Sequence, residues 1–180
     1  MTRPLRLGFP VKVMGRPDLK SNDTRGWRRD PHLKQSLEYL DAILDYLARV
    51  EIDMYRMSSD LAPYATHPDM PQFHRQVEES DAELAAFGRK ARELDIRLSF
   101  HPSQFVLLNS PNEELTRKSI WDLSSQAEML DRMGKRLFGL RDEGSERIGE
   151  LLEAVGLAHR ASTRVGEMSA GIAHEIRNPL

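Results

Sequence analysis

The alternation of hydrophobic and polar residues predicts three strand–helix units in the first three quarters of the chain. Short runs alternate apolar and polar positions as half-buried strands do, at 5–9, 54–57 and 96–100. Each is followed, after a loop, by a segment whose hydrophobic residues recur every three or four positions, at 33–47, 80–94 and 110–130. Because a helix between two strands returns the chain across a sheet, we expect parallel strands and an α/β fold.

Two short sequences indicate where the second and third helices begin. The stretch from Ser80 to Glu83 has the Ser-x-x-Glu form of a capping box. The stretch from Ser110 to Glu113 repeats that form, with Pro111 in the favoured first helical position. We therefore expect the hydroxyl groups of both serines to cap these helices, with the alternative that the helix near Ser80 begins a turn earlier.

Long loops follow the predicted strands, and functional groups of parallel α/β folds lie at the carboxyl ends of strands. The first loop, 11–31, belongs to a basic segment, because residues 1–30 hold eight Lys or Arg against three Asp although the whole chain has a net charge of −2. Such a segment can bind phosphates. A solvated loop explains the same charge equally well.

The composition is that of a globular protein of one domain or slightly more. The 180 residues include no cysteine, which excludes disulfides, thiolate metal sites and a cysteine nucleophile. No apolar run approaches the roughly 20 residues that span a bilayer, and the N-terminus lacks the apolar segment of a signal peptide. We therefore expect a cytoplasmic protein without a membrane partner.

Two histidines and an amide–aromatic pair are the candidate functional residues. His67 and His101 each follow a predicted strand and precede a proline, and imidazole is the commonest metal-binding side chain. The alternative is that both cap loop turns. Gln104 and Phe105 follow His101, and a planar amide beside an exposed aromatic can probe a base pair. Alternatively, Phe105 anchors its loop in the core.

Three stretches, RLGFPVKVMG, MYRMSSDLAPYATHP and RLSFHPSQFVLLNSP, resemble the UV damage endonuclease family of DNA repair enzymes. The resemblance covers about residues 5–134, including the spacing between the stretches. It implies an incomplete (β/α)8 TIM-type barrel with about three βα units, a divalent metal, typically manganese, and double-stranded DNA with ultraviolet lesions as partner. The implied reaction is incision on the 5′ side of an ultraviolet photoproduct.

The same resemblance implies a role for each candidate residue. His67 and His101 would bind the metal, while Gln104 and Phe105, the latter a tyrosine in many members, would enter the duplex opposite the lesion. The family's remaining metal ligands come from later strands, so we expect this chain to be inactive. Another metal-dependent TIM barrel of the sugar-isomerase kind is an alternative.

The pattern changes after residue 134, where no further strand is predicted. Residues 145–178 form one helical candidate with a near-heptad spacing of apolar residues. Its end, GEMSAGIAHEIRNPL, resembles the phosphoacceptor block of sensor histidine kinases. By that resemblance His174 would accept phosphate, Glu175 would act as its base, and the helix would dimerise.

The sequence therefore divides into two regions with unrelated resemblances, as a chimera does. Residues 1–134 are expected to form a partial UV-damage-endonuclease-like barrel. Residues 135–180 are expected to form a histidine-kinase-like dimerisation and phosphoacceptor helix. The alternative function is a phosphoacceptor fragment of two-component signalling.

Overall fold

A computed structural model describes residues 5–134, which contain three strands, four α-helices and two 3₁₀ turns. The chain divides into two compact units. The first comprises residues 1–103 with 125–138, and the second comprises residues 104–124 with 139–180. The expected helix at 145–178, its proposed dimerisation, His174 and Glu175 lie outside the described residues.

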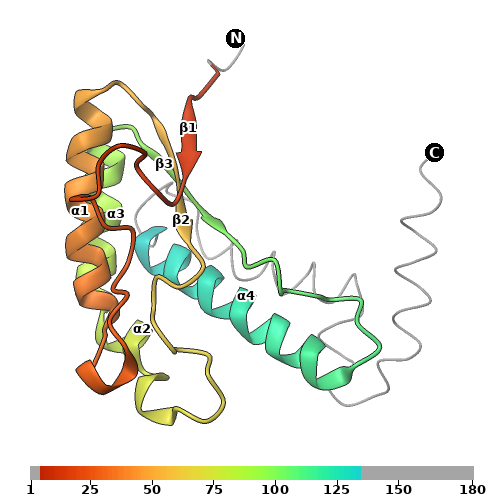
Figure 1. The fold of residues 1–180 in the computed structure, drawn as a ribbon. Helices are drawn as coiled ribbons and strands as arrows, with labels where there is room; N and C mark the ends of the chain where they lie inside the picture. The colour runs from red at the N-terminus through yellow and green to blue at the C-terminus, as the bar shows by residue number, and fades with distance from the viewer. Residues whose placement is uncertain (1–4, 135–180) are drawn as a thin grey trace, which may run out of the picture. The chain divides into compact units, whose positions relative to one another are not determined.

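The first unit contains a three-stranded parallel sheet in the order β1-β2-β3 (Figure 1). Its strands are β1 (Gly8–Pro10), β2 (Met54–Ser58) and β3 (Arg97–His101). The parallel sheet and the α/β class predicted from the sequence are confirmed.

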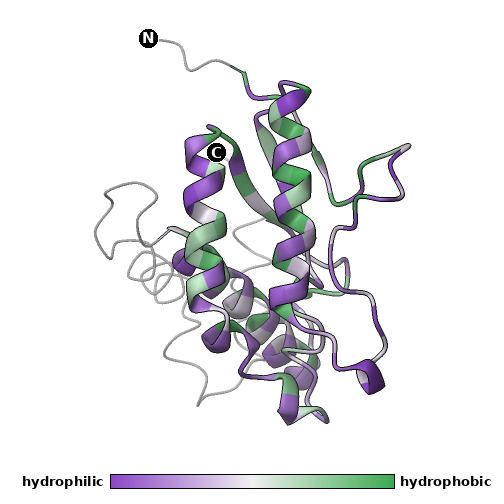
Figure 2. Cartoon of the chain, turned by 90° about the vertical axis from the view of Figure 1, so that its left-hand side faces the viewer, coloured by the Kyte–Doolittle hydropathy of each residue, from purple (hydrophilic) through white to green (hydrophobic). Residues whose placement is uncertain are grey.

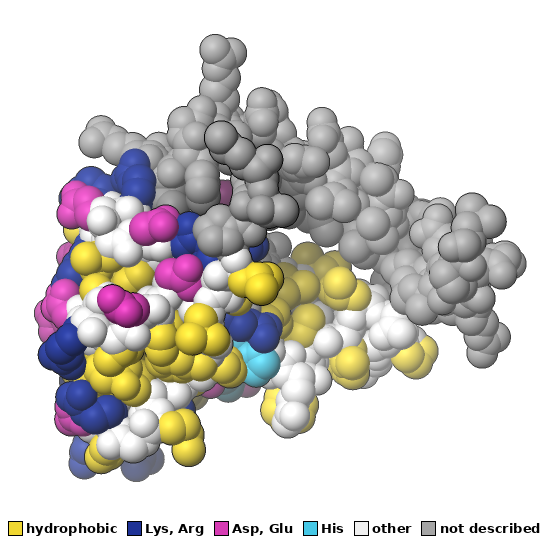
Figure 3. All heavy atoms as spheres, turned by 90° about the horizontal axis from the view of Figure 1, so that it is seen from above, with side chains coloured by type: hydrophobic (Ala, Val, Ile, Leu, Met, Phe, Trp, Pro, Cys, Tyr) yellow, Lys and Arg dark blue, Asp and Glu magenta, His cyan; other side chains and the backbone are white. Residues whose placement is uncertain are grey.

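The first strand begins later than the sequence predicts. Leu5 and Leu7 are exposed, so their alternation with polar residues does not contribute to the described core. Seen from above, hydrophobic side chains gather on the surface among acidic and basic ones (Figure 3). Alternation alone therefore placed the start of this strand too early, because it does not reveal which apolar residues find a packing partner.

Helices α1 (Leu33–Arg49) and α3 (Asp81–Glu93) lie side by side over one face of the sheet (Figures 1 and 2). The two helices are joined by Lys90, whose Nζ lies 2.7 Å from carboxylate oxygens of both Asp41 and Asp45. Their apolar stripes pack against the sheet and form the core predicted from the three- and four-residue spacing.

The sheet has an apolar face toward the helices and a polar face on the other side. Phe9, Tyr55 and Leu98 lie opposite one another in register and pack in or against the core. Pro10, Arg56 and Ser99 occupy the next positions of the three strands. Because side chains alternate along a strand, these residues and His101 point away from α1 and α3.

Helix α4 (Glu113–Gly134) begins in the second unit and ends in the first. In the first unit Met129 and Met133 are buried in the core. Gly88 of α3 lies so close to Met133 that a Cβ atom at this position would overlap the Met133 carbonyl group. Only glycine therefore permits this approach of the two helices.

The two predicted serine caps are wrong. The Ser80 hydroxyl is buried and has no hydrogen-bond partner among the described residues, because the short helix α2 (Gln76–Glu79) runs directly into Ser80. The hydroxyl of Ser110 instead accepts from the Asn112 N–H at 3.1 Å. Asn112 caps α4 through Oδ1, which accepts from the N–H groups of Glu114 (3.0 Å) and Leu115 (3.3 Å).

Both long loops of the first unit contain short ordered turns. The 3₁₀ turn η1 (Trp27–Arg29) lies in the loop between β1 and α1, and η2 (Pro71–Phe73) lies between β2 and α2. In the part of the chain that the structure describes, no helix has both the length and the apolarity needed to cross a membrane.

Candidate functional site at the carboxyl edge of the sheet

The two candidate histidines follow neighbouring strands at one edge of the sheet. Strands β2 and β3 are parallel, and Ser58 at the end of β2 pairs with His101 at the end of β3. His67 lies in the loop that leaves β2. Because parallel strands end at the same edge, both histidines belong to the carboxyl side of the sheet, where functional groups of such folds gather.

His101 is the last residue of β3, and its side chain is exposed. Phe100 before it is buried in the core, so His101 lies on the opposite, polar face. Ser99, two residues before His101 and on the same face of the strand, has a buried hydroxyl without a hydrogen-bond partner among residues 5–134. Arg56 stands beside it in register. This face therefore presents polar groups next to a candidate metal ligand.

His67 is half-buried and takes part in the turn that contains it. Its Nδ1 accepts a hydrogen bond from the Asp69 N–H at 3.2 Å, and a ring nitrogen of His74 lies 2.7 Å from its carbonyl oxygen. The Tyr64 ring packs edge-on against the imidazole. The turn-capping role left open by the sequence is therefore present.

That capping bond bears on metal binding, because the two ring nitrogens of neutral imidazole have opposite roles. When Nδ1 accepts a hydrogen bond, Nε2 carries the proton. A metal at Nε2 requires that proton on Nδ1 instead. The Asp69 bond and a metal at Nε2 of His67 therefore exclude each other.

No group of three or more His, Asp or Glu side chains within residues 5–134 is placed to hold a metal ion. Two imidazoles supply only part of a coordination sphere, since hard divalent cations also favour carboxylate oxygens. The described residues could therefore supply some of the ligands of a metal site but not all of them.

Gln104 and Phe105 form a turn in the second unit, just after β3. Both are exposed, and 72% of the Phe105 surface is accessible to solvent. The alternative in which Phe105 anchors its loop in the core is therefore wrong. Within this unit, Ser119 of α4 holds the loop by accepting from the Leu107 N–H at 2.9 Å.

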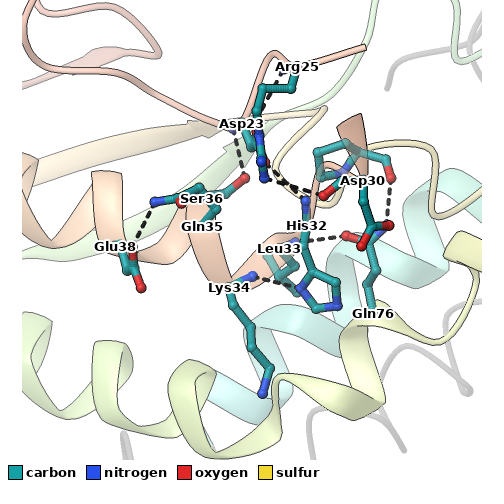
Figure 4. A network of polar contacts seen from close by, with 11 residues as sticks. Asp23, Arg25, Asp30, His32, Leu33, Lys34, Gln35, Ser36, Glu38 and Gln76 are labelled. Atoms are coloured by element: carbon teal, nitrogen blue, oxygen red, sulfur yellow. Dashed lines mark hydrogen bonds and ion pairs between the residues drawn. The ribbon is translucent and has the colours of Figure 1, made fainter. Parts of the chain in front are cut away.

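A buried carboxylate organises the loop between β1 and α1 (Figure 4). Asp23 is 2% exposed, and its oxygens accept from the Arg25 guanidinium at 2.6 Å and from the His32 N–H at 3.0 Å. Its own N–H donates to Ser36 Oγ at 2.9 Å. Burial opposes ionisation, but the bonds from Arg25 and the backbone outweigh it and hold the pKa of Asp23 below its usual range.

A buried amide joins two loops of the same edge. Gln76 is 1% exposed, and its Oε1 accepts from the Leu33 N–H at 2.7 Å (Figure 4). Its Nε2 donates to the Pro63 carbonyl at 2.6 Å. Gln76 thus links the first turn of α1 to the loop that carries His67.

A strained residue follows β1. Val11 has φ 55°, a left-handed conformation that costs a β-branched residue free energy. Its N–H donates to the Arg56 carbonyl at 2.8 Å, and its carbonyl accepts from the Tyr55 hydroxyl at 2.6 Å. Burial raises the pKa of Tyr55, so this hydroxyl stays protonated and remains a donor.

Sequence reasoning missed Asp23, Gln76 and Tyr55 as organisers of this edge. Asp23 and Gln76 stand among other polar residues in their segments. The polar pattern carried no signal that these two, unlike their neighbours, are buried. Their burial depends on loops that meet only in the fold.

Comparison with known proteins gives a consistent result. The profile of the family described as UV-endonuclease UvdE matches residues 21–137. A UV DNA damage endonuclease of Bacillus velezensis is 34% identical over 143 residues, which are 72% of this chain and 44% of the relative. One from Bacillus anthracis is 36% identical over 108 residues, covering 56% of this chain and 31% of the relative.

A solved structure agrees with these relatives. The crystal structure of SacUVDE matches with a TM-score of 0.61 and 29% identity, over 73% of this chain and 46% of that one. The chain therefore spans less than half the length of the relatives that it matches.

Proposed function

The chain belongs to the UV-endonuclease UvdE family, and from this premise we propose that it acts on double-stranded DNA with ultraviolet lesions, as a DNA repair endonuclease of the cytoplasm. The reaction to which the chain contributes, as part of a complete (β/α)8 barrel, is incision on the 5′ side of a photoproduct. The family match over residues 21–137 is the main observation that supports this proposal. The parallel sheet and the likeness to SacUVDE support a (β/α)8 barrel as the complete architecture.

We propose that His67 and His101 contribute ligands to a divalent metal, namely manganese. Their positions after β2 and β3 support this, because both belong to the carboxyl edge. When bound, such an ion neutralises charge on a phosphate and lowers the pKa of a water molecule. His67 would bind through Nε2 only if Nδ1 gave up its hydrogen bond from the Asp69 N–H and carried the proton instead.

Gln104 and Phe105 enter the duplex at the lesion in this proposal. The exposure of both side chains supports it, since a solvent-exposed aromatic ring can fill the space of a displaced base. A damaged base pair stacks poorly and costs less to open than an intact one. The pair therefore provides lesion preference rather than overall affinity.

The test is binding of the 180-residue chain to a labelled duplex with one photoproduct and to the same duplex undamaged, by fluorescence anisotropy. We expect tighter binding to the damaged duplex and about tenfold less preference in Phe105→Ala. Leu107→Ala removes another exposed apolar side chain of this loop and is the matched control. Equal binding of both duplexes by the unaltered chain would refute the proposed function.

The motif GEMSAGIAHEIRNPL supports a second function for residues 135–180. We propose that this region dimerises as a histidine-kinase-like helix and that His174 accepts phosphate with Glu175 as base. The test supplies a kinase ATP-binding domain and labelled ATP. Acid-labile labelling that is lost in His174→Gln is the expected result, and equal labelling of that variant counts against the assignment.

A further inference from the structure

The turn η1 presents an aromatic and two cationic side chains to solvent. None of its three residues is buried, and 47% of the Trp27 surface is exposed. The Arg28 guanidinium lies over the Trp27 ring, 5.0 Å from its centre. Tryptophan gains most when buried, so one that is held at the surface beside arginines gives little to the described core.

This turn is anchored on both sides. Before it, Arg25 is bound to the buried Asp23 and donates from Nη2 to the Asp30 carbonyl at 3.3 Å. After it, the Asp30 N–H donates to the Trp27 carbonyl at 3.2 Å, and the His32 N–H is held by Asp23. Figure 4 shows Asp23, Arg25, Asp30 and His32 gathered close together. A partner therefore binds η1 without first having to order it.

The loop that contains η1 has a positive net charge, whereas the whole chain has a negative one. Residues 11–31 hold six basic and three acidic residues, whereas the chain has a net charge of −2. Two of the acidic residues, Asp18 and Asp23, are paired with Arg16 and Arg25. Arg28 and Arg29 form no ion pair with a carboxylate among residues 5–134. Their charges remain available to an anionic partner.

The position of η1 links it to the candidate site. It leads into the start of α1, and a helix that follows a parallel strand begins at the carboxyl edge of the sheet. Figure 1 shows η1 and α2 at the same end of the first unit. Gln76 bridges the start of α1 and the loop of His67. The turn and His67 therefore belong to one hydrogen-bonded edge.

We propose that Trp27, Arg28 and Arg29 form a DNA contact of their own, on the phosphate backbone of the duplex beside the lesion. The two guanidinium groups bind phosphates, and the indole packs on the adjacent deoxyribose. This inference rests on the proposed function but adds a contact that reads no lesion. It therefore sets affinity for any duplex, in contrast to Gln104 and Phe105.

The first test measures the salt dependence of duplex binding by the full chain. Arg28→Gln/Arg29→Gln removes two phosphate contacts, so the slope of log affinity against log salt should fall by about 2. Binding to damaged and undamaged duplex should weaken by the same factor. The matched control is Arg49→Gln/Arg97→Gln, at the opposite edge of the sheet, where Arg49 also lies over an aromatic ring, that of Tyr46.

The second test detects the contact at Trp27 directly. The chain has two tryptophans, so Trp121→Phe leaves Trp27 as the only indole. Saturating duplex should change its fluorescence, and Arg28→Gln/Arg29→Gln in the same background should reduce that change at equal DNA concentration.

The outcomes separate this inference from the proposed function. The η1 contact is refuted if both double variants bind duplex equally well and duplex does not change the Trp27 fluorescence. That result leaves the proposed DNA binding of the chain intact. An unaltered chain without salt-dependent duplex binding overturns both. Thermal midpoints of the two double variants must match, because the substituted side chains are exposed.

Discussion

At the residue scale, the candidate edge depends on buried polar side chains that lie between its loops. Asp23 gathers donors from its own loop and from the start of α1, and Gln76 ties that start to the loop of His67. A buried polar group contributes most when all its partners are present, and its loss leaves several others unsatisfied. Asp23 and Gln76 therefore contribute more to the stability of this edge than the surface ion pairs do.

Replacing Gln76 by methionine should lower the free energy of unfolding by about 3 kcal/mol, because the buried Leu33 N–H and Pro63 carbonyl both lose their partner. Urea unfolding followed by circular dichroism measures this change. Gln72→Met is the control, since Gln72 is exposed and lies in the neighbouring turn η2. Equal effects of the two substitutions would contradict the bridging role.

The pH dependence of stability should reveal Asp23. Its pKa is lowered in the folded state, so its contribution is present above the unfolded value of 3.8 and is lost as the pH falls below it. Asp23→Asn should cost about 2 kcal/mol at pH 7 and flatten the decline of stability as the pH falls below 3.8.

Urea unfolding at a series of pH values measures the effect of Asp23. The exposed Asp18, which pairs with Arg16, is the control, because Asp18→Asn should leave stability nearly unchanged at pH 7. If the stability of Asp23→Asn declined with pH in parallel with that of the unaltered chain, the pKa of Asp23 would not be lowered in the folded state.

At the element scale, the sequence pattern succeeded where one packing face determines the structure. The apolar spacing placed α1 and α3 and the core because burial repeats with the helical period. It failed at the caps, because α2 runs into Ser80, and because Asn112 rather than Ser110 caps α4. The site was predictable only as residues that follow strands, since His67, Asp23 and Gln76 are connected by loops whose paths the pattern does not encode.

The contact between α3 and α4 gives a prediction for an element. Gly88→Ala should destabilise the protein by about 2 kcal/mol, although alanine favours helices, because its Cβ would overlap the Met133 carbonyl group. Thermal unfolding measures the change. The same substitution at Gly26 is the control, since that residue has open space around it and φ −65°. A Gly88→Ala variant as stable as Gly26→Ala would refute the close approach.

At the scale of the whole molecule, family and activity must be distinguished. The chain belongs to the UvdE family but spans less than half of its matched relatives. Among residues 5–134, no cluster of three metal-binding side chains is formed. The proposed DNA contacts and the proposed metal ligands can therefore be tested separately in this polypeptide.

We predict that the 180-residue chain alone does not incise irradiated DNA above background. Metal-assisted activation of a water molecule needs fixed geometry and supporting groups, and the two imidazoles within residues 5–134 do not provide them. A nicking assay on ultraviolet-treated duplex with manganese measures this, with His67→Ala and His101→Ala alongside. Lesion-dependent cleavage by the unaltered chain that both variants lose would contradict the prediction while supporting the ligand assignment.

The order of the strands also has a consequence for biosynthesis. Gly8 of β1 pairs with Met54 of β2, and Met54 pairs with Arg97 of β3, so the order in space is the order of translation. As the chain leaves the ribosome, β2 meets a completed β1, and β3 meets a completed β2. No strand of this sheet has to insert between two others. The sheet can therefore grow at one side, one βα unit at a time, while synthesis continues.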